Sequence, residues 1–183
     1  MLKVKQLVSK KEFYEFALRP ENRDRNFEYI AGEIVEVVSN GKSSRKGFSL
    51  ALEVGVFVKK HKLGRCTGAD GGYVVSGEDY IPDGAFMSYA RQPEANDEPY
   101  NPLAPDLAIE MLSPGNTKQE ISHKVGNYMA AGTVLWLGDP ETKIIDVYVP
   151  GQPVKRLRLG EFLDGGDVLP GFRLAIADIF EDS

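Results

Sequence analysis

Two carboxylates lie inside segments that are otherwise apolar. Asp83 sits within residues 81–86, beside apolar residues and glycine, and Glu110 is the only charge within residues 107–112. A charge in a buried strand lowers the stability of the fold by several kcal/mol unless it is paired or binds a metal. Successive side chains of a strand point to opposite faces, so Asp106 and Glu110 share one face. Asp83 and Glu110 are therefore the first candidates for chemistry.

One divalent cation could bind both carboxylates if their strands are neighbours. Such an ion orients phosphate and water, lowers the pKa of the water, and neutralises charge in an in-line displacement. The chain has one cysteine, Cys66, and two histidines, His61 and His123, which are too few for a structural zinc site. Oxygen ligands favour hard ions. The sequence predicts an Mg²⁺ or Mn²⁺ site at Asp83 and Glu110.

A cation is also expected beside such a site, where it would help to activate water or stabilise the pentavalent phosphate. Lys124 is the candidate, because it lies at the edge of the apolar stripe of a helix predicted over residues 117–131. Its aliphatic stem can follow the packed face while the ammonium reaches the carboxylates. Lys118 points in a similar direction but belongs to the first turn, which makes it the weaker candidate. His123 is expected on the helix surface.

The elements that must position these side chains alternate between helix and strand. Capping boxes at Ser9 and Thr117 open two helices, over residues 10–18 and 117–131. A third helix is predicted over residues 45–61, after a polar loop at 39–44, with its apolar face formed by Phe48, Leu52, Val56 and Phe57. Strands are predicted at residues 27–30, 33–38, 73–75, 81–87, 106–112, 133–137, 143–149 and 156–159. This order indicates an α/β domain with a mixed sheet.

Length and composition favour one globular domain over residues 1–183, with a core of about residues 9–180. A hydrophobic content of 42% argues against disorder across the chain. The longest apolar runs are interrupted by charge, so neither a membrane span nor a secretory signal is expected. The single cysteine excludes an intrachain disulfide framework and fits the cytoplasm.

The net charge of −5 argues mildly against nucleic acid as a partner but does not exclude it. Carboxylates gathered at a metal site add negative charge, while another surface can still be basic. Three clusters are basic, and each is most simply interpreted as a solvated face. They are Lys42, Arg45 and Lys46, then Lys59, Lys60, Lys62 and Arg65, and finally Lys155, Arg156 and Arg158.

An ordered set of short motifs resembles the Uma2 (Uma-two) family of restriction-endonuclease-like proteins. Each motif is weak alone, but together they span about residues 9 to 180. They are Tyr29 with Gly32-Glu33-Ile34, Pro82-Asp83, Pro105-Asp106-Leu107 with Glu110 and Leu112-Ser113-Pro114, Lys124 with Tyr128 and Gly132, Trp136 with Asp139-Pro140, and Leu169-Pro170-Gly171-Phe172.

The resemblance implies the restriction-endonuclease-like fold, a mixed β-sheet flanked by helices, with a Pro-Asp…(Asp/Glu)-x-Lys site. Glu110 would be its acidic member, while Leu112 stands where the lysine is expected, and Lys124 on the next helix would replace that lysine. Glu33 matches an N-terminal acidic position and would complete the metal shell as a further catalytic residue. The family commonly has a histidine near the start of the helix after Val38, and Arg45 stands there in this chain.

Two functions are compatible with these features. The first is a divalent-metal-dependent endonuclease that hydrolyses phosphodiester bonds of DNA and works as a homodimer, since two sites can then reach both strands. Residues 174–180 and 143–149 are candidates for its interface, or for ordinary core. The second is a catalytically inactive module of the same fold for DNA binding or protein association. The lack of a lysine at position 112 and the acidic charge favour the second; Asp83, Glu110 and Lys124 favour the first.

Overall fold

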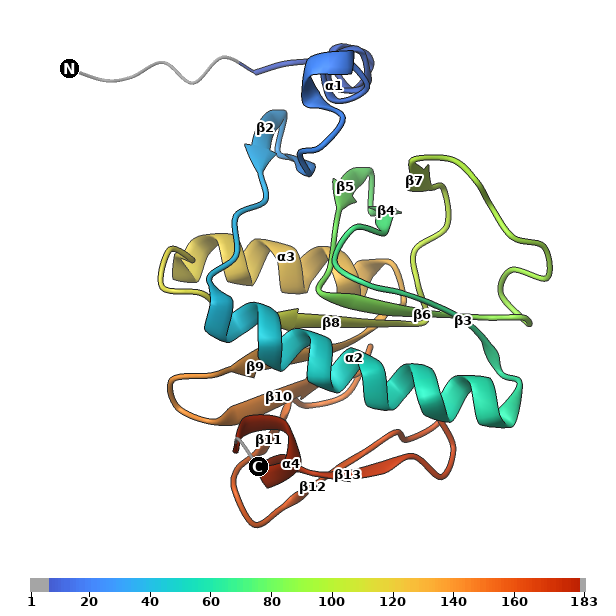
Figure 1. Cartoon of the computed structure of the whole chain (residues 1–183), viewed down its shortest axis with the longest axis vertical. Helices are drawn as coiled ribbons and strands as arrows, with labels where there is room; N and C mark the ends of the chain where they lie inside the picture. Colours follow the sequence, from blue (N-terminus) through green and yellow to red (C-terminus); the bar gives the residue numbers. More distant parts are fainter. Residues whose placement is uncertain (1–6, 182–183) are drawn as a thin grey trace.

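The structure is a computed structural model that describes residues 7–181, and it places helices around two main β-sheets (Figure 1). The helices are α1 (Lys10–Ala17), α2 (Gly41–His61), α3 (Lys118–Ala130) and α4 (Ile176–Phe180), with a 3₁₀ turn at Pro20–Asn22. The strands are β1 (Phe27–Ile30), β2 (Glu33–Glu36), β3 (Gly64–Thr67), β4 (Gly72–Val75), β5 (Glu78–Tyr80), β6 (Gly84–Ser88), β7 (Tyr100–Asn101), β8 (Leu107–Met111), β9 (Val134–Asp139), β10 (Ile144–Tyr148), β11 (Lys155–Leu157), β12 (Phe162–Asp164) and β13 (Arg173–Ala175).

The central sheet has the strand order β11-β10-β9-β8-β6-β3, and β8 lies inside it. The strand β8 runs antiparallel to β6 and parallel to β9, so both of its edges are hydrogen-bonded. Leu107 and Ile109 pack on the side of α2, whereas Ala108 packs with Tyr128 of α3 on the other side. Helices therefore cover both faces, which explains why β8 is almost continuously apolar and why Glu110 is exceptional in it.

A second sheet, of order β2-β1-β5-β4-β7, lies beside the central sheet under α1 (Figure 1). The β1–β2 hairpin turns at Ala31-Gly32, where both residues adopt positive φ. Phe13 of α1 is fully buried among aromatic rings that include Tyr29 and Tyr100. This sheet brings residues 27–30 close to elements that follow much later in the chain.

The structure confirms the predicted fold class, a mixed α/β arrangement, and most of the predicted elements. Both capping boxes form, at Ser9 with Glu12 and at Thr117 with Glu120. The polar loop predicted at residues 39–44 is confirmed at 39–40 and wrong at 41–44. The side chain of Asn40 accepts hydrogen bonds from the first backbone amides of α2 and so starts this helix at Gly41.

The apolar face predicted for α2 is wrong at three of its four residues, and Phe57 alone of the four packs against the core. Phe48, Leu52 and Val56 are at least half exposed, and the buried face instead carries Leu50 and Val54. It also contains Ser43, Gly47 and Val58. The small residues let the helix approach the sheet closely, and a hydrophobicity pattern does not register this because Gly and Ser are not counted as apolar anchors.

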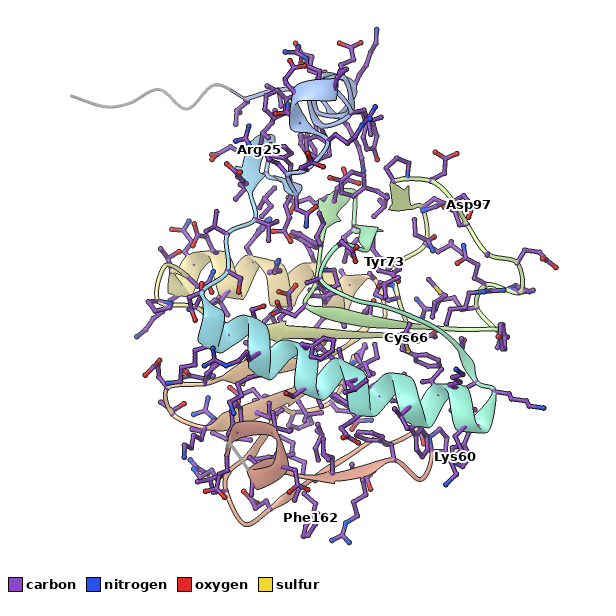
Figure 2. The ribbon with its side chains drawn as sticks, in the orientation of Figure 1. Arg25, Lys60, Cys66, Tyr73, Asp97 and Phe162 are labelled. Carbon is purple, nitrogen blue, oxygen red and sulfur yellow. The ribbon has the colours of Figure 1, made fainter. Side chains whose placement is uncertain are left out.

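The basic cluster at the C-terminal end of α2 is confirmed as exposed at Lys59 and Lys60. Figure 2 shows Lys60 near this end of the helix. Gly47 of the same helix packs against Asp83, and thirteen residues of α-helix span about 20 Å. The cluster therefore lies well away from the Asp83 region.

The two segments considered for a dimer interface belong to the core. Ile176 and Ile179 of α4 are buried, as are Ile145 and Val147 of β10, all in one cluster with Trp136. Their apolar character is thus explained by packing within one chain. Among residues 7–181, no helix combines the length and apolar content needed to cross a membrane.

A close contact between α2 and the start of β6 fixes the position of Asp83. A Cβ atom added to Gly47 would lie 2.9 Å from Cβ of Asp83, and one added to Gly84 would lie 2.7 Å from Cβ of Ala51. Both separations are too short for real carbon atoms. Glycine is therefore required at both positions for this helix–strand spacing.

We expect Gly47→Ala to destabilise the protein relative to Gly55→Ala by about 1–3 kcal/mol, the usual cost of overpacking. Gly55 is the matched control, because it lies in the same helix and a Cβ there would meet nothing within 4 Å. Both substitutions gain helix propensity equally, so their difference isolates the contact with Asp83. Urea denaturation measures it, and equal stabilities would contradict the close-contact argument.

Candidate active site

Asp83 lies in a bend immediately before β6, not inside the strand predicted over residues 81–87, and Glu110 lies on the neighbouring strand β8. Gly84 of β6 pairs with Ile109 of β8 in antiparallel register, and extending that register by one residue places Asp83 opposite Glu110. Oδ2 of Asp83 accepts a hydrogen bond of 2.6 Å from the backbone N–H of Met111. The two carboxylates are thus held at one end of the β6–β8 pair by backbone geometry.

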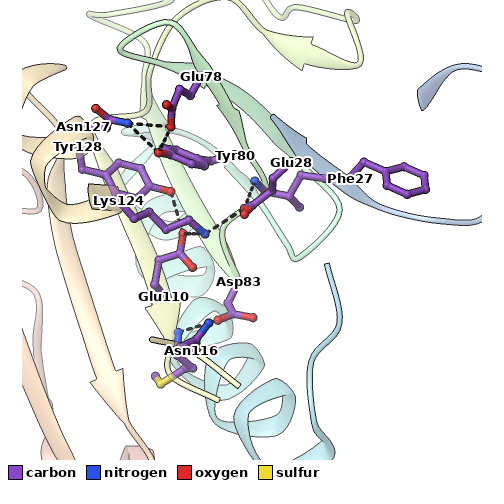
Figure 3. A network of polar contacts seen from close by, with 12 residues as sticks. Phe27, Glu28, Glu78, Tyr80, Asp83, Glu110, Asn116, Lys124, Asn127 and Tyr128 are labelled. Atoms are coloured by element: carbon purple, nitrogen blue, oxygen red, sulfur yellow. Dashed lines mark hydrogen bonds and ion pairs between the residues drawn. The ribbon is translucent and has the colours of Figure 1, made fainter. Parts of the chain in front are cut away.

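Lys124 of α3 reaches this pair and forms the centre of a buried charge cluster (Figure 3). Its Nζ lies 3.0 Å from Oε1 of Glu110 and 2.9 Å from Oε1 of Glu28. The ammonium also sits 5.0 Å from the centre of the Tyr80 ring. Lys124 projects toward the carboxylates, as its place on the predicted helix indicated.

Glu28 is the acidic residue that the sequence analysis missed. Its side chain is 7% exposed, and Oε1 accepts the backbone N–H of Ile81 at 2.8 Å in addition to the Lys124 ammonium. The available signal was the one used for Glu110, a lone acid in the apolar strand Phe27–Ile30. Its contact with Lys124 spans 96 positions of the chain, and local patterns do not reveal such a pairing.

Glu33, the predicted N-terminal site residue, lies one strand further out. It is half-buried at the start of β2, where it pairs with Ile30. Glu28 of the neighbouring strand makes the contact with Lys124. Glu33 lines the same groove as Glu110 and Lys124, so its role in a metal shell stays a prediction.

Burial sets the electrostatics of Glu110. It raises the pKa of this carboxyl to about 7, against the attraction of the Lys124 ammonium and with the added repulsion of Glu28 and Asp83. Burial also raises the pKa of Asp83, partly offset by the hydrogen bond from the backbone of Met111. Both carboxylates therefore lie where additional positive charge would stabilise their ionised forms.

The pKa of Lys124 is set by its two neighbouring carboxylates more than by burial. Burial alone would lower its pKa, but the carboxylates of Glu110 and Glu28 outweigh burial and raise it, so the ammonium stays charged. Tyr128 donates a 2.9 Å hydrogen bond from its hydroxyl to Oε1 of Glu110. Burial beside these carboxylates raises the pKa of Tyr128, which keeps its hydroxyl protonated as a donor.

The donor set fits a magnesium-type ion. Within residues 7–181, Oε2 of Glu110 and Oδ1 of Asp83 make no hydrogen bond to protein, and no group of three or more His, Cys, Asp or Glu side chains is arranged as a metal cage. Mg²⁺ commonly binds through one or two carboxylates and completes its shell with water and substrate phosphate. Asp83 and Glu110 supply such a pair.

A groove of about 700 Å³ opens onto Glu110, Lys124 and Glu28, whereas Asp83 is not among its lining residues. Its walls come from β1, β2, the loop after β8, and α3. They include Glu28, Ile30, Glu33, Val35, Glu36, Val38, Glu110, Ser113, Asn116, Thr117, Glu120, Ile121, His123, Lys124 and Val125. A substrate that reached Glu110 through this groove would pass along α3.

Asp106 lies on the same face of the strand as Glu110 but has a different environment. Its Oδ1 is 3.0 Å from Nε of Arg91, and its Oδ2 accepts the backbone N–H of Ser88 at 2.7 Å. These contacts tie the long loop after β6 to the start of β8. Asp106 is therefore satisfied as a structural residue outside the cluster.

We expect Lys124→Met to lower the free energy of unfolding by about 3–5 kcal/mol, because it leaves Glu28 and Glu110 buried together without their cation. Adding Glu28→Gln should recover part of this loss, since the Gln carbonyl can still accept the Ile81 amide while one negative charge is removed. Chemical denaturation of both variants measures the effect. A single variant as stable as the wild type would show that the ion pair contributes nothing.

Comparison with known proteins identifies a family and a similar fold. The sequence profile of the Uma2 family, described as "Putative restriction endonuclease", matches residues 11–177. Among solved structures, the chain is similar to a "putative nuclease belonging to DUF820" from Anabaena variabilis ATCC 29413, with a TM-score of 0.78, 24% identity, and coverage of 92% of this chain and 96% of that one. A search of functionally curated proteins finds no match. With the profile covering nearly its whole length, the chain belongs to the Uma2 family.

Proposed function

We propose that this protein is a divalent-metal-dependent endonuclease that hydrolyses phosphodiester bonds of DNA. The observation that carries the proposal is the placement of Asp83, just before β6, opposite Glu110 of the adjacent strand β8, with the Lys124 ammonium beside Glu110. Family membership supports a nuclease. In this proposal Mg²⁺ or Mn²⁺ binds to Asp83 and Glu110 and, when bound, polarises the phosphodiester and lowers the pKa of a water molecule.

The protein's own groups position the reaction. Asp83 is held by the backbone N–H of Met111, and Glu110 is held by Tyr128 and Lys124, so neither carboxylate needs to reorient before it binds a cation. Lys124 has three N–H donors, of which Glu28 and Glu110 engage two. The remaining donor is available to the negative charge that develops on the phosphate.

The first test concerns the cation. Manganese titration by calorimetry should show strongly weakened binding in Asp83→Asn and in Glu110→Gln, because each removes one anionic ligand. Asp106→Asn is the matched control: it removes a carboxylate from the same face of the β8 segment, but one that pairs with Arg91. Affinities equal to wild type in both site variants would remove the metal assignment.

The second test separates chemistry from folding. In a plasmid-nicking assay with Mg²⁺, Lys124→Met should lower cleavage by about two to three orders of magnitude, the range for one positioned electrostatic group. The loss of cleavage should persist in the Lys124→Met/Glu28→Gln double variant. The single variant Glu28→Gln measures how much of the change in cleavage comes from replacing Glu28 itself. Lys118→Ala, an exposed lysine in the first turn of α3, should cut like the wild type.

Melting curves for each variant show whether lost cleavage reflects lost folding. A folded Lys124→Met that cuts at the wild-type rate would restrict this lysine to a structural role. A wild type that binds DNA yet cuts no substrate would favour the alternative, a catalytically inactive module of the same fold. Homodimer formation stays a prediction from the sequence, now without the two segments assigned to the core.

A further inference from the structure

A histidine–carboxylate pair stands on the wall of the groove, one residue before Lys124. Nε2 of His123 lies 3.0 Å from both carboxylate oxygens of Glu78, and the His123 side chain is 42% exposed. A carboxylate oxygen accepts only from an N–H, so this geometry puts a hydrogen on Nε2. The other ring nitrogen, Nδ1, makes no hydrogen bond to any residue from 7 to 181, and the side chain lines the groove.

Glu78 is held more firmly than an ordinary surface carboxylate. It accepts hydrogen bonds from the Tyr80 hydroxyl at 2.5 Å, the Asn127 amide at 2.9 Å and the backbone N–H of Ala31 at 2.8 Å. Figure 3 shows Glu78, Tyr80 and Asn127 converging beside the Lys124 cluster. Burial raises the pKa of Glu78, but these hydrogen bonds and His123 outweigh burial and lower it, so the group is ionised. The imidazole of His123 is thus oriented by a fixed anion.

The groove otherwise presents little that would attract a phosphate. Its acidic lining residues are Glu28, Glu33, Glu36, Glu110 and Glu120. The basic lining residues among the described part of the chain are Lys124 and His123, and two carboxylates already hold Lys124. His123 is the basic groove side chain with a ring nitrogen, Nδ1, that makes no hydrogen bond to any residue from 7 to 181.

We propose that His123, oriented by Glu78, is a phosphate-binding residue of this groove that contacts a phosphodiester oxygen of the nucleic-acid strand. The inference rests on the proposed nuclease function and adds a specific contact to it. The donor would be Nδ1–H of the imidazolium, with Nε2–H held by Glu78. A non-bridging phosphate oxygen carries the negative charge that such a donor recognises.

The chain allows a direct test because it has only two histidines, His61 and His123. We would record imidazole resonances of ¹⁵N-histidine-labelled full-length protein while adding the dinucleotide TpT in Ca²⁺, which is used to suppress cleavage. His123 resonances should shift saturably, whereas those of His61, at the end of α2, should not move. The uncharged methylphosphonate analogue of TpT should produce no shift, since it lacks the anionic oxygen.

Variants of His123 and Glu78 test the same contact through their affinity for TpT. His123→Gln should weaken TpT binding about tenfold, as expected for loss of one hydrogen bond to a charged group. Glu78→Gln should weaken it less, because the ring is kept but loses its anionic anchor. Lys118→Ala, in the first turn of α3 and outside the groove lining, is the control and should bind like wild type. A pair that only ties β5 to α3 would lower the melting temperature in both variants without changing TpT affinity.

The outcomes separate this inference from the proposed function. TpT-dependent shifts at His123 in a protein that cuts no DNA would support the phosphate contact while removing the nuclease. If the wild type cuts DNA but its His123 resonances do not shift when TpT is added, the proposed phosphate contact is wrong while the nuclease function stands. Equal shifts at both histidines, equal shifts with the methylphosphonate, or no binding of TpT would also overturn it.

Discussion

The ion pairs of Lys124 are the interaction on which the site depends. One ammonium joins α3 to Glu110 of the central sheet and to Glu28 of the second sheet. A buried carboxylate without a partner is strongly destabilising, so each acid requires this lysine and the lysine requires both acids. The same contacts that assemble the charged groups therefore also connect the two sheets and α3.

The position of Asp83 depends on a second constraint, which is steric. Gly47 and Ala51 of α2 face Asp83 and Gly84, and the spacing leaves no room for a larger side chain at either glycine. Protein interiors transmit such contacts because they are packed like crystals. Two different kinds of force thus locate the two proposed metal ligands: close helix packing for Asp83, and charge pairing with a hydrogen bond from Tyr128 for Glu110.

The parts of the molecule that were predictable from sequence are those governed by local physics. Capping boxes, the β1–β2 turn and the apolar character of β8 depend on neighbours within a few residues, and all appear in the structure. The buried face of α2 was assigned to the wrong side because Phe48, Leu52 and Val56 form an exposed apolar row, while the face toward the sheet mixes Leu50, Val54 and Val58 with small residues. Glu28 escaped notice because a lone acid in a short strand acquires meaning only from a partner 96 positions away.

The charges of the buried cluster around Lys124 do not balance. Glu28, Asp83 and Glu110 bring three potential negative charges, and Lys124 supplies one positive charge. With all three carboxylates ionised, a charge of −2 remains. Burial is the main cause of the raised pKa values of Asp83 and Glu110, and repulsion from the neighbouring carboxylates adds to it. A hard divalent cation would neutralise this charge with no further protein ligand. Burial disfavours the ionised forms of Asp83 and Glu110, so a bound cation would stabilise charges that the protein alone holds at a cost.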